Sequence, residues 1–154
     1  MKKAYTPNIN SSKGKQLTNY VSKFVHKTTF KNIPSSVVGL AKKHILDGFG
    51  LALSGSVART GEYLFKQIKK NSANGRATVI GSKMKVPSQF AALANGVGIH
   101  SDDYDDTQLA VGSDRVYGLL THPTAPCLPS AFAEGEINNI SGKDFLNAYL
   151  IGVD

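Results

Sequence analysis

A long apolar segment just after Pro34 constrains the fold of this 154-residue chain more than any other feature. Apolar residues recur from Val37 to Leu53 at spacings that place them all around a helical cylinder instead of along one stripe. A helix of this kind is stable when other elements cover it on several sides. We therefore expect a central core helix that begins at Pro34 and ends at Gly55-Ser56.

Shorter periodic segments predict further helices around this central one. The expected helices span residues 16–27, 62–71 and 89–97, then run from Pro126 or Pro129 to residue 136, and a last one follows a capping box at Ser141. Residues 77–80 are β-branched and bounded by glycines, and we expect one strand there without an evident partner. Residues 107–124 show no sustained period and are expected to be a long loop. The sequence thus predicts a mainly α-helical fold.

The formal net charge of +7 is concentrated near the N-terminus. Residues 1–46 contain nine lysines and no acidic residue. Nucleic-acid-binding proteins usually combine such charge with arginines, interleaved aromatic residues or a recognisable module, and the sequence has no zinc-ligand spacing, RNP-like run or Gly-Lys-Ser loop. We expect a solvated lysine-rich surface and no nucleic-acid partner.

Residues 1–15 are basic and polar, and we expect them to form a flexible tail ahead of a folded part at residues 16–154. The tail lacks the apolar core of a secretion signal and the arginines of a mitochondrial presequence. Every apolar stretch is interrupted before it reaches the roughly 18–20 residues of a membrane span. The sequence therefore predicts a cytoplasmic protein without a membrane partner. The single Cys127 excludes an internal disulfide and cannot supply the thiolates of an iron–sulfur cluster.

Four aspartates fall within the five positions from 102 to 106. Carboxylates at this density repel one another, so folding them together costs free energy unless a metal, a cation or a shared proton offsets the repulsion. Asp102, Asp103 and Asp106 satisfy the Asp-Asp-x-x-Asp pattern of magnesium–diphosphate enzymes, but the second acidic motif of such enzymes is absent. An EF-hand loop is excluded because Gln108 replaces the required glycine.

A third interpretation assigns proton transfer to the same aspartates. One of them would act as a general acid or base whose pKa its neighbours tune, with His122 as its cationic or proton-carrying partner. The alternative is purely structural: Asp102 and Asp105 would face solvent, and Asp106 would cap a helix. In that case His122 would simply pack before Pro123. Spacing alone leaves both interpretations open.

Three motifs follow one another in this region: Asn95-Gly96 with His100, then Asp103-Tyr104-Asp105-Asp106-Thr107, then His122-Pro123-Thr124. Together they resemble the MmgE/PrpD family of 2-methylcitrate dehydratases and cis-aconitate decarboxylases. The flanking segments agree with that family, in particular Leu46-Asp47-Gly48, Leu53-Ser54-Gly55-Ser56 and Ser141-Gly142-Lys143-Asp144-Phe145. The resemblance covers residues 16–154.

The resemblance implies a mostly helical domain that carries an active site and that a smaller α/β lid domain completes in longer chains. Members of the family act on small di- and tricarboxylic acids without a cofactor or metal, as dehydratases, decarboxylases or epimerases, and typically form homodimers. Each of these reactions labilises a bond beside a carboxylate.

The resemblance also implies roles for individual residues. Asp103 and His122 are expected to be catalytic, the first as an acid, base or orienting group and the second as a proton donor or anion-binding group. The expected substrate-binding residues are Thr107, Asp106, Asn95 and His100. Asp106 would also orient His122 or its loop. For Asn95 a helix C-cap, and for His100 simple packing, remain equally open.

The last predicted helix reaches Asp154 without a glycine, a proline or another stop signal, which is typical of a chain cut within an element. We therefore expect the N-terminal portion of a cofactor-independent lyase, similar to 2-methylcitrate dehydratase, that abstracts a proton and expels water. A decarboxylase or epimerase on the same scaffold and a catalytically silent helical remnant are the alternatives.

Overall fold

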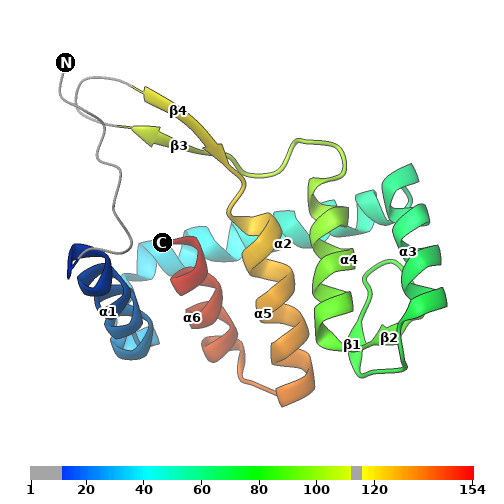
Figure 1. The fold of residues 1–154 in the computed structure, drawn as a ribbon, viewed down its shortest axis with the longest axis horizontal. Helices are drawn as coiled ribbons and strands as arrows, with labels where there is room; N and C mark the ends of the chain where they lie inside the picture. The colour runs from blue at the N-terminus through cyan, green and yellow to red at the C-terminus, as the bar shows by residue number, and fades with distance from the viewer. Residues whose placement is uncertain (1–11, 112–115) are drawn as a thin grey trace.

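The computed structural model describes residues 12–111 and 116–154, and it confirms the prediction of a mainly α-helical fold. Helices α1 to α6 and one 3-10 turn account for most of these residues (Figure 1). In chain order the elements are α1 Ser12–Lys27, η1 Phe30–Asn32, α2 Ser35–Ser56, α3 Arg59–Asn71, β1 Ala77–Thr78, β2 Lys85–Val86, α4 Ser88–His100, β3 Gln108–Val111, β4 Val116–Thr121, α5 Thr124–Asn138 and α6 Gly142–Val153. In the described residues, no helix combines the length and apolar character required to cross a bilayer.

Helix α2 is the central element predicted from its apolar sequence. It runs lengthwise behind α4, α5 and α6, which cross it side by side (Figure 1), and it contacts all three. Ala41, Leu51 and Ala52 of α2 are buried in a core with Leu128 of α5. Part of α2 remains uncovered in the described residues, since Leu46 is 75% exposed. The apolar periodicity identifies a helix that needs covering but does not identify what covers each face.

Two glycines allow α2 and α4 to approach closely. A Cβ atom on Gly55 would lie 1.9 Å from the carbonyl oxygen of Gly98, and one on Gly98 would lie 3.1 Å from the carbonyl oxygen of Ala52. Only residues without side chains permit backbones to meet at such distances. The crossing fixes α4, and with it the residues at the C-terminal end of α4.

Both β-hairpins differ from the sequence-based expectation. Residues 77–80 do have a partner, because β1 pairs antiparallel with β2 in the register Ala77↔Val86. The segment expected to be a long loop, residues 107–124, contains the antiparallel pair β3 and β4, with Leu109 opposite Leu120. Two-residue strands and an irregular register leave little periodic signal in a sequence.

Helix boundaries shift by a few residues from those expected. Helix α1 begins at Ser12, four residues earlier than expected, and the rest of the predicted tail, residues 1–11, lies outside the described residues. Helix α4 continues to His100, and α5 begins at Thr124 with Pro129 inside it. The predicted cap of α6 is confirmed: the Ser141 hydroxyl accepts a hydrogen bond from a backbone amide in the first turn.

Candidate functional site

The site lies where the C-terminal end of α4 meets the N-terminal end of α5. The chain leaves α4 after His100, passes through the aspartates into the β3–β4 hairpin, and returns through His122 and Pro123 into α5. Figure 1 shows the upper ends of α4 and α5 next to each other, with the hairpin extending from them toward the upper left. The antiparallel pairing Gln108↔Thr121 at the base of the hairpin keeps the outgoing and returning segments together.

A left-handed backbone conformation places Asp103. Its φ angle is 54°, and its amide donates a 3.3 Å hydrogen bond to the carbonyl oxygen of His100. Aspartate is one of the few residues with a side chain that tolerate this conformation. The turn brings the Asp103 carboxylate to 3.8 Å from Nε2 of His122, with the Asp103 side chain 79% exposed.

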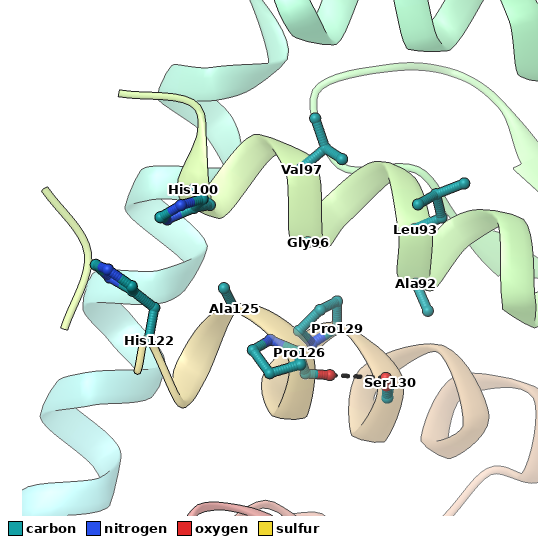
Figure 2. A pocket seen from close by; sticks show the side chains of 10 residues that line it. All are labelled: Ala92, Leu93, Gly96, Val97, His100, His122, Ala125, Pro126, Pro129 and Ser130. Carbon is teal, nitrogen blue, oxygen red and sulfur yellow. Dashed lines mark hydrogen bonds between the residues drawn. The ribbon is translucent and has the colours of Figure 1, made fainter. Parts of the chain in front are cut away.

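Asp105 joins two histidines from different helix ends. Its side chain is fully buried, and its Oδ1 atom lies 2.9 Å from Nδ1 of His100 and 3.2 Å from Nδ1 of His122. The two imidazole rings lie 4.5 Å apart between centroids (Figure 2). The structural alternative in which Asp105 faces solvent is therefore wrong. The sequence motif includes Asp105 but indicates no role for it, since burial of one aspartate among four leaves no sequence signal.

The electrostatics of this group favour a proton on His100. The hydrogen bond to Asp105 is the largest cause of a raised His100 pKa, partial burial opposes it, and the charges of Asp105 and Asp103 add to it. Asp105 Oδ2 and His122 Nδ1 are both buried and lack a hydrogen-bond partner. Such atoms are costly in a folded protein, and a catalytic role is one reason why a protein retains them.

One donor atom from each of His100, Asp103, Asp105 and His122 lies within 4.8 Å of the others, so these are the residues that could approach a metal ion. His122 faces Asp105 with Nδ1 and Asp103 with Nε2, and these nitrogens point to different sides of one ring. A ring between two carboxylates suits the passage of a proton from a buried group to an exposed one.

The histidine pair stands at one end of an open pocket of about 450 Å³ between α4 and α5 (Figure 2). The other walls are largely apolar: Ala92, Leu93, Gly96, Val97, Ala125, Pro126, Pro129 and Ser130. Within this lining set, His100 and His122 are the side chains able to carry positive charge. An anionic ligand in the pocket would therefore meet them.

Asp106 and Thr107, both predicted to bind substrate, lie beside a different pocket, of about 320 Å³, with His44. Both Asp106 oxygens contact Thr124, through its amide at 3.1 Å and its hydroxyl at 2.7 Å. Asp106 thus caps α5, as the structural alternative predicted. Thr107 is exposed, and its hydroxyl lies 3.4 Å from the Asp105 carbonyl oxygen.

Asn95 is not part of the histidine cluster. Its buried side chain accepts a 2.8 Å hydrogen bond from the Ile80 amide and donates a 2.9 Å bond to the Thr78 carbonyl oxygen. These bonds tie α4 to the β1 segment. The alternative of a helix C-cap is wrong, because α4 continues past Asn95 to His100.

Comparison with known proteins agrees with the resemblance noted from the motifs. The description "MmgE/PrpD N-terminal domain" matches residues 19–154. The chain is 30% identical over 145 residues to the cis-aconitate decarboxylase of Homo sapiens and 28% identical to that of Mus musculus, covering 91% of this chain and 28% of each relative. It is 31% identical over 130 residues, 80% of this chain and 25% of the relative, to the cis-aconitate decarboxylase-like protein oryM of Aspergillus oryzae. The chain thus spans about a quarter of the length of these relatives.

Proposed function

Because the chain belongs to the MmgE/PrpD family, we propose that it is the N-terminal portion of a lyase acting on a small polycarboxylate, without a cofactor. The observation that carries this proposal is the buried Asp105 carboxylate between His100 and His122 at the end of a pocket. The names of the relatives support this enzyme class, since decarboxylases are lyases.

Proton transfer near neutral pH is the chemistry that this group supports. Imidazole titrates in the range where a general acid and a general base are both effective. Asp105 contacts both rings and raises the pKa of His100. His122 is proposed to exchange the proton at the reacting atom, with Asp103 beside its Nε2 atom on the exposed side. His100, whose pKa is raised by its bond to Asp105, is proposed to bind a substrate carboxylate as a cation.

Decarboxylation of cis-aconitate is the first reaction to test, since the relatives carry that name. Loss of the carboxyl group leaves a carbanion that must take up a proton, and His122 is proposed to donate it. Dehydration of a 2-methylcitrate-like substrate is the second candidate. It requires one base for carbon and one acid for the leaving hydroxyl, and two imidazoles sharing one carboxylate offer both.

A polycarboxylate carries more negative charge than two histidines can neutralise. We propose that further basic groups complete the site in the whole protein, as the α/β lid domain implied by the family resemblance would allow. We also propose a homodimer, as the family resemblance implies, and a cytoplasmic location, as the N-terminal sequence predicts. If the chain is instead a catalytically silent helical remnant, the histidine cluster would be present but no substrate would be converted.

The test is a pair of lyase assays on the protein as its source cells make it, after its intact mass has been determined. Release of CO₂ from cis-aconitate and loss of water from 2-methylcitrate are measured for the natural protein and for His122→Gln. General acid–base groups contribute about 10²- to 10⁴-fold, so we expect His122→Gln to lose at least about a hundredfold in kcat. His26→Gln, at an exposed histidine of α1, is the matched control and should change kcat by less than twofold. Full activity in His122→Gln, or no turnover of either substrate by the natural protein, would overturn the proposal.

A further inference from the structure

Asp106 makes a two-point contact with a single residue across the site. Its Oδ1 atom accepts a 3.1 Å hydrogen bond from the Thr124 amide, and its Oδ2 atom accepts a 2.7 Å bond from the Thr124 hydroxyl. Two parallel bonds fix orientation as well as distance. The amide belongs to the first turn of α5, where backbone donors have no partner within the helix and attract negative charge.

This contact runs beside the one between Asp105 and His122. Asp105 and Asp106 are consecutive on the outgoing segment, while His122 and Thr124 are separated by one residue on the returning segment. That residue is Pro123, whose ring restricts φ, here −68°. A displacement of Thr124 is therefore transmitted to His122 with little freedom in between.

A buried chain of hydroxyls anchors Thr124 from the other side. Its Oγ1 atom lies 2.6 Å from the Tyr149 hydroxyl of α6, and both residues are 2% exposed. A hydroxyl has one proton to donate, so when Thr124 donates to Asp106, Tyr149 must donate to Thr124. Burial and the nearby Asp106 charge both raise the Tyr149 pKa, which keeps that proton in place, although the Thr124 bond acts the other way.

His44 of α2 approaches the same carboxylate from a third element. Its Nδ1 atom lies 3.5 Å from Asp106 Oδ2, and the His44 side chain is 38% exposed while that of Asp106 is 16% exposed. Asp106 thus connects α2, the start of α5 and, through Thr124, α6. A residue that serves three elements suits a framework role more than direct contact with a ligand.

We propose that Asp106 and Thr124 form a clamp of positioning residues that holds His122 against Asp105, with Tyr149 and His44 as outer supports. The inference deepens the proposed function and rests on it for its kinetic consequence only. Of the two roles expected for Asp106 from the family resemblance, binding substrate and orienting His122 or its loop, the clamp corresponds to the second. Its geometric consequence can be measured without any turnover.

The first measurement follows the His122 ring in the protein as its source cells make it. Histidine side-chain NMR spectra are compared for the natural protein, Thr124→Val and Thr124→Ser. Valine keeps the shape and the amide but lacks the hydroxyl, whereas serine keeps both hydrogen-bonding groups. We expect Thr124→Val to move the His122 resonances and Thr124→Ser to leave them near their natural positions. Unmoved His122 resonances in a folded Thr124→Val protein would contradict the clamp.

The second measurement separates positioning from substrate binding. A displacement of about 1 Å at a reacting group can cost roughly a hundredfold in rate, so we expect Thr124→Val and Asp106→Asn to lower kcat about ten- to a hundredfold, with KM changed less than threefold. Asp102→Asn removes the same charge from an exposed neighbour and serves as the matched control. A raised KM with kcat intact would overturn the clamp in favour of a substrate-binding role.

Failure of the two proposals can be told apart. If the lyase proposal fails, no substrate is turned over, and the NMR comparison alone decides the clamp. If only the clamp fails, His122→Gln still abolishes turnover while Thr124→Val leaves both kcat and the His122 resonances unchanged. Circular dichroism on each variant establishes that it is folded, and Asp106→Asn supplies an independent variant where Thr124→Val does not fold.

Discussion

His100 at the end of α4 holds Asp105 through a 2.9 Å contact between Nδ1 and Oδ1, although the histidine is half exposed and the aspartate side chain is fully buried. The imidazole of His100 therefore offers a positive charge to the buried Asp105 carboxylate, which would be costly to bury alone. This contact, with the 3.2 Å contact to His122, explains how one aspartate of a repelling cluster can be buried. It also makes His100 the residue whose ionisation reports the state of the site.

Replacing Asp105 by Asn should bring the His100 pKa back toward its ordinary value. The hydrogen bond to Asp105 is the leading cause of the raised pKa, while Asp103 contributes through its charge alone and least of all. Asp103→Asn should therefore lower the pKa less than Asp105→Asn does. Histidine NMR titrations measure the His100 pKa in the two variants. If both variants lowered the pKa equally, simple charge, and not the hydrogen bond, would set the His100 pKa.

The same pair predicts a pH dependence of stability. The folded-state pKa of His100 is raised above the ordinary 6.5, so its pairing with Asp105 stabilises the fold fully below about pH 6.5 and the contribution is lost as pH rises through the raised value. His100→Gln should reduce the change in the free energy of unfolding with pH over this range. Denaturant unfolding at a series of pH values measures it, with the exposed His26→Gln as control. If the free energy of unfolding of His100→Gln changed with pH in parallel with that of the natural protein, the prediction would be contradicted.

The sequence indicates which segment carries the candidate site but not how the side chains are arranged within it. The motifs identify the segment, because clustered carboxylates and histidines beside turns are unusual in a loop that has only a structural role. They do not separate Asp105, which is buried, from Asp102, which is exposed. That difference depends on tertiary contacts to His100 and His122, which come from two helix ends brought together only in the fold. His44 was missed for the same reason, since it is distant in sequence from Asp106.

For the fold, long periodic helices were predictable and short pairings were not. The apolar character of α2 and the Ser141 cap are local properties that a sequence displays directly. The β1–β2 pair has two residues in each strand and is held partly by a contact from α5, a distant element. Such pairings are settled by tertiary contacts that no local pattern encodes.

Two glycines of α2 should respond in opposite directions to alanine. A Cβ on Gly55 would lie 1.9 Å from a backbone oxygen of α4, whereas a Cβ on Gly50 meets nothing within 4 Å. Gly55→Ala should lower the free energy of unfolding by at least about 1–3 kcal/mol through overpacking. Gly50→Ala should raise it by roughly 0.5–1 kcal/mol through helix propensity. Chemical denaturation of both variants tests the crossing, and a small effect at Gly55 would mean that α2 and α4 lie farther apart.

Glu136 of α5 should stabilise the β1–β2 hairpin through its charge. It accepts hydrogen bonds from the amide and hydroxyl of Thr78 and pairs with the ammonium group of Lys85. Burial alone would raise the Glu136 pKa, but the bonds from Lys85 and Thr78 outweigh it and lower the pKa below 4.5. The contribution is therefore present above about pH 4.5 and lost as pH falls through the lowered value.

Glu136→Gln keeps the shape of the side chain and removes the charge. Because its side chain is one-quarter exposed, we expect a loss of about 1–2 kcal/mol in the free energy of unfolding at pH 7, toward the lower part of the range for hydrogen bonds to charged groups. Glu134→Gln, at an exposed site two residues earlier in α5, should stay within about 0.5 kcal/mol of the natural protein. Urea unfolding at pH 7 and at acid pH measures both variants. The natural protein and Glu136→Gln should become equally stable once Glu136 is protonated. If the difference in their free energies of unfolding persisted unchanged at acid pH, packing and not charge would join α5 to the hairpin.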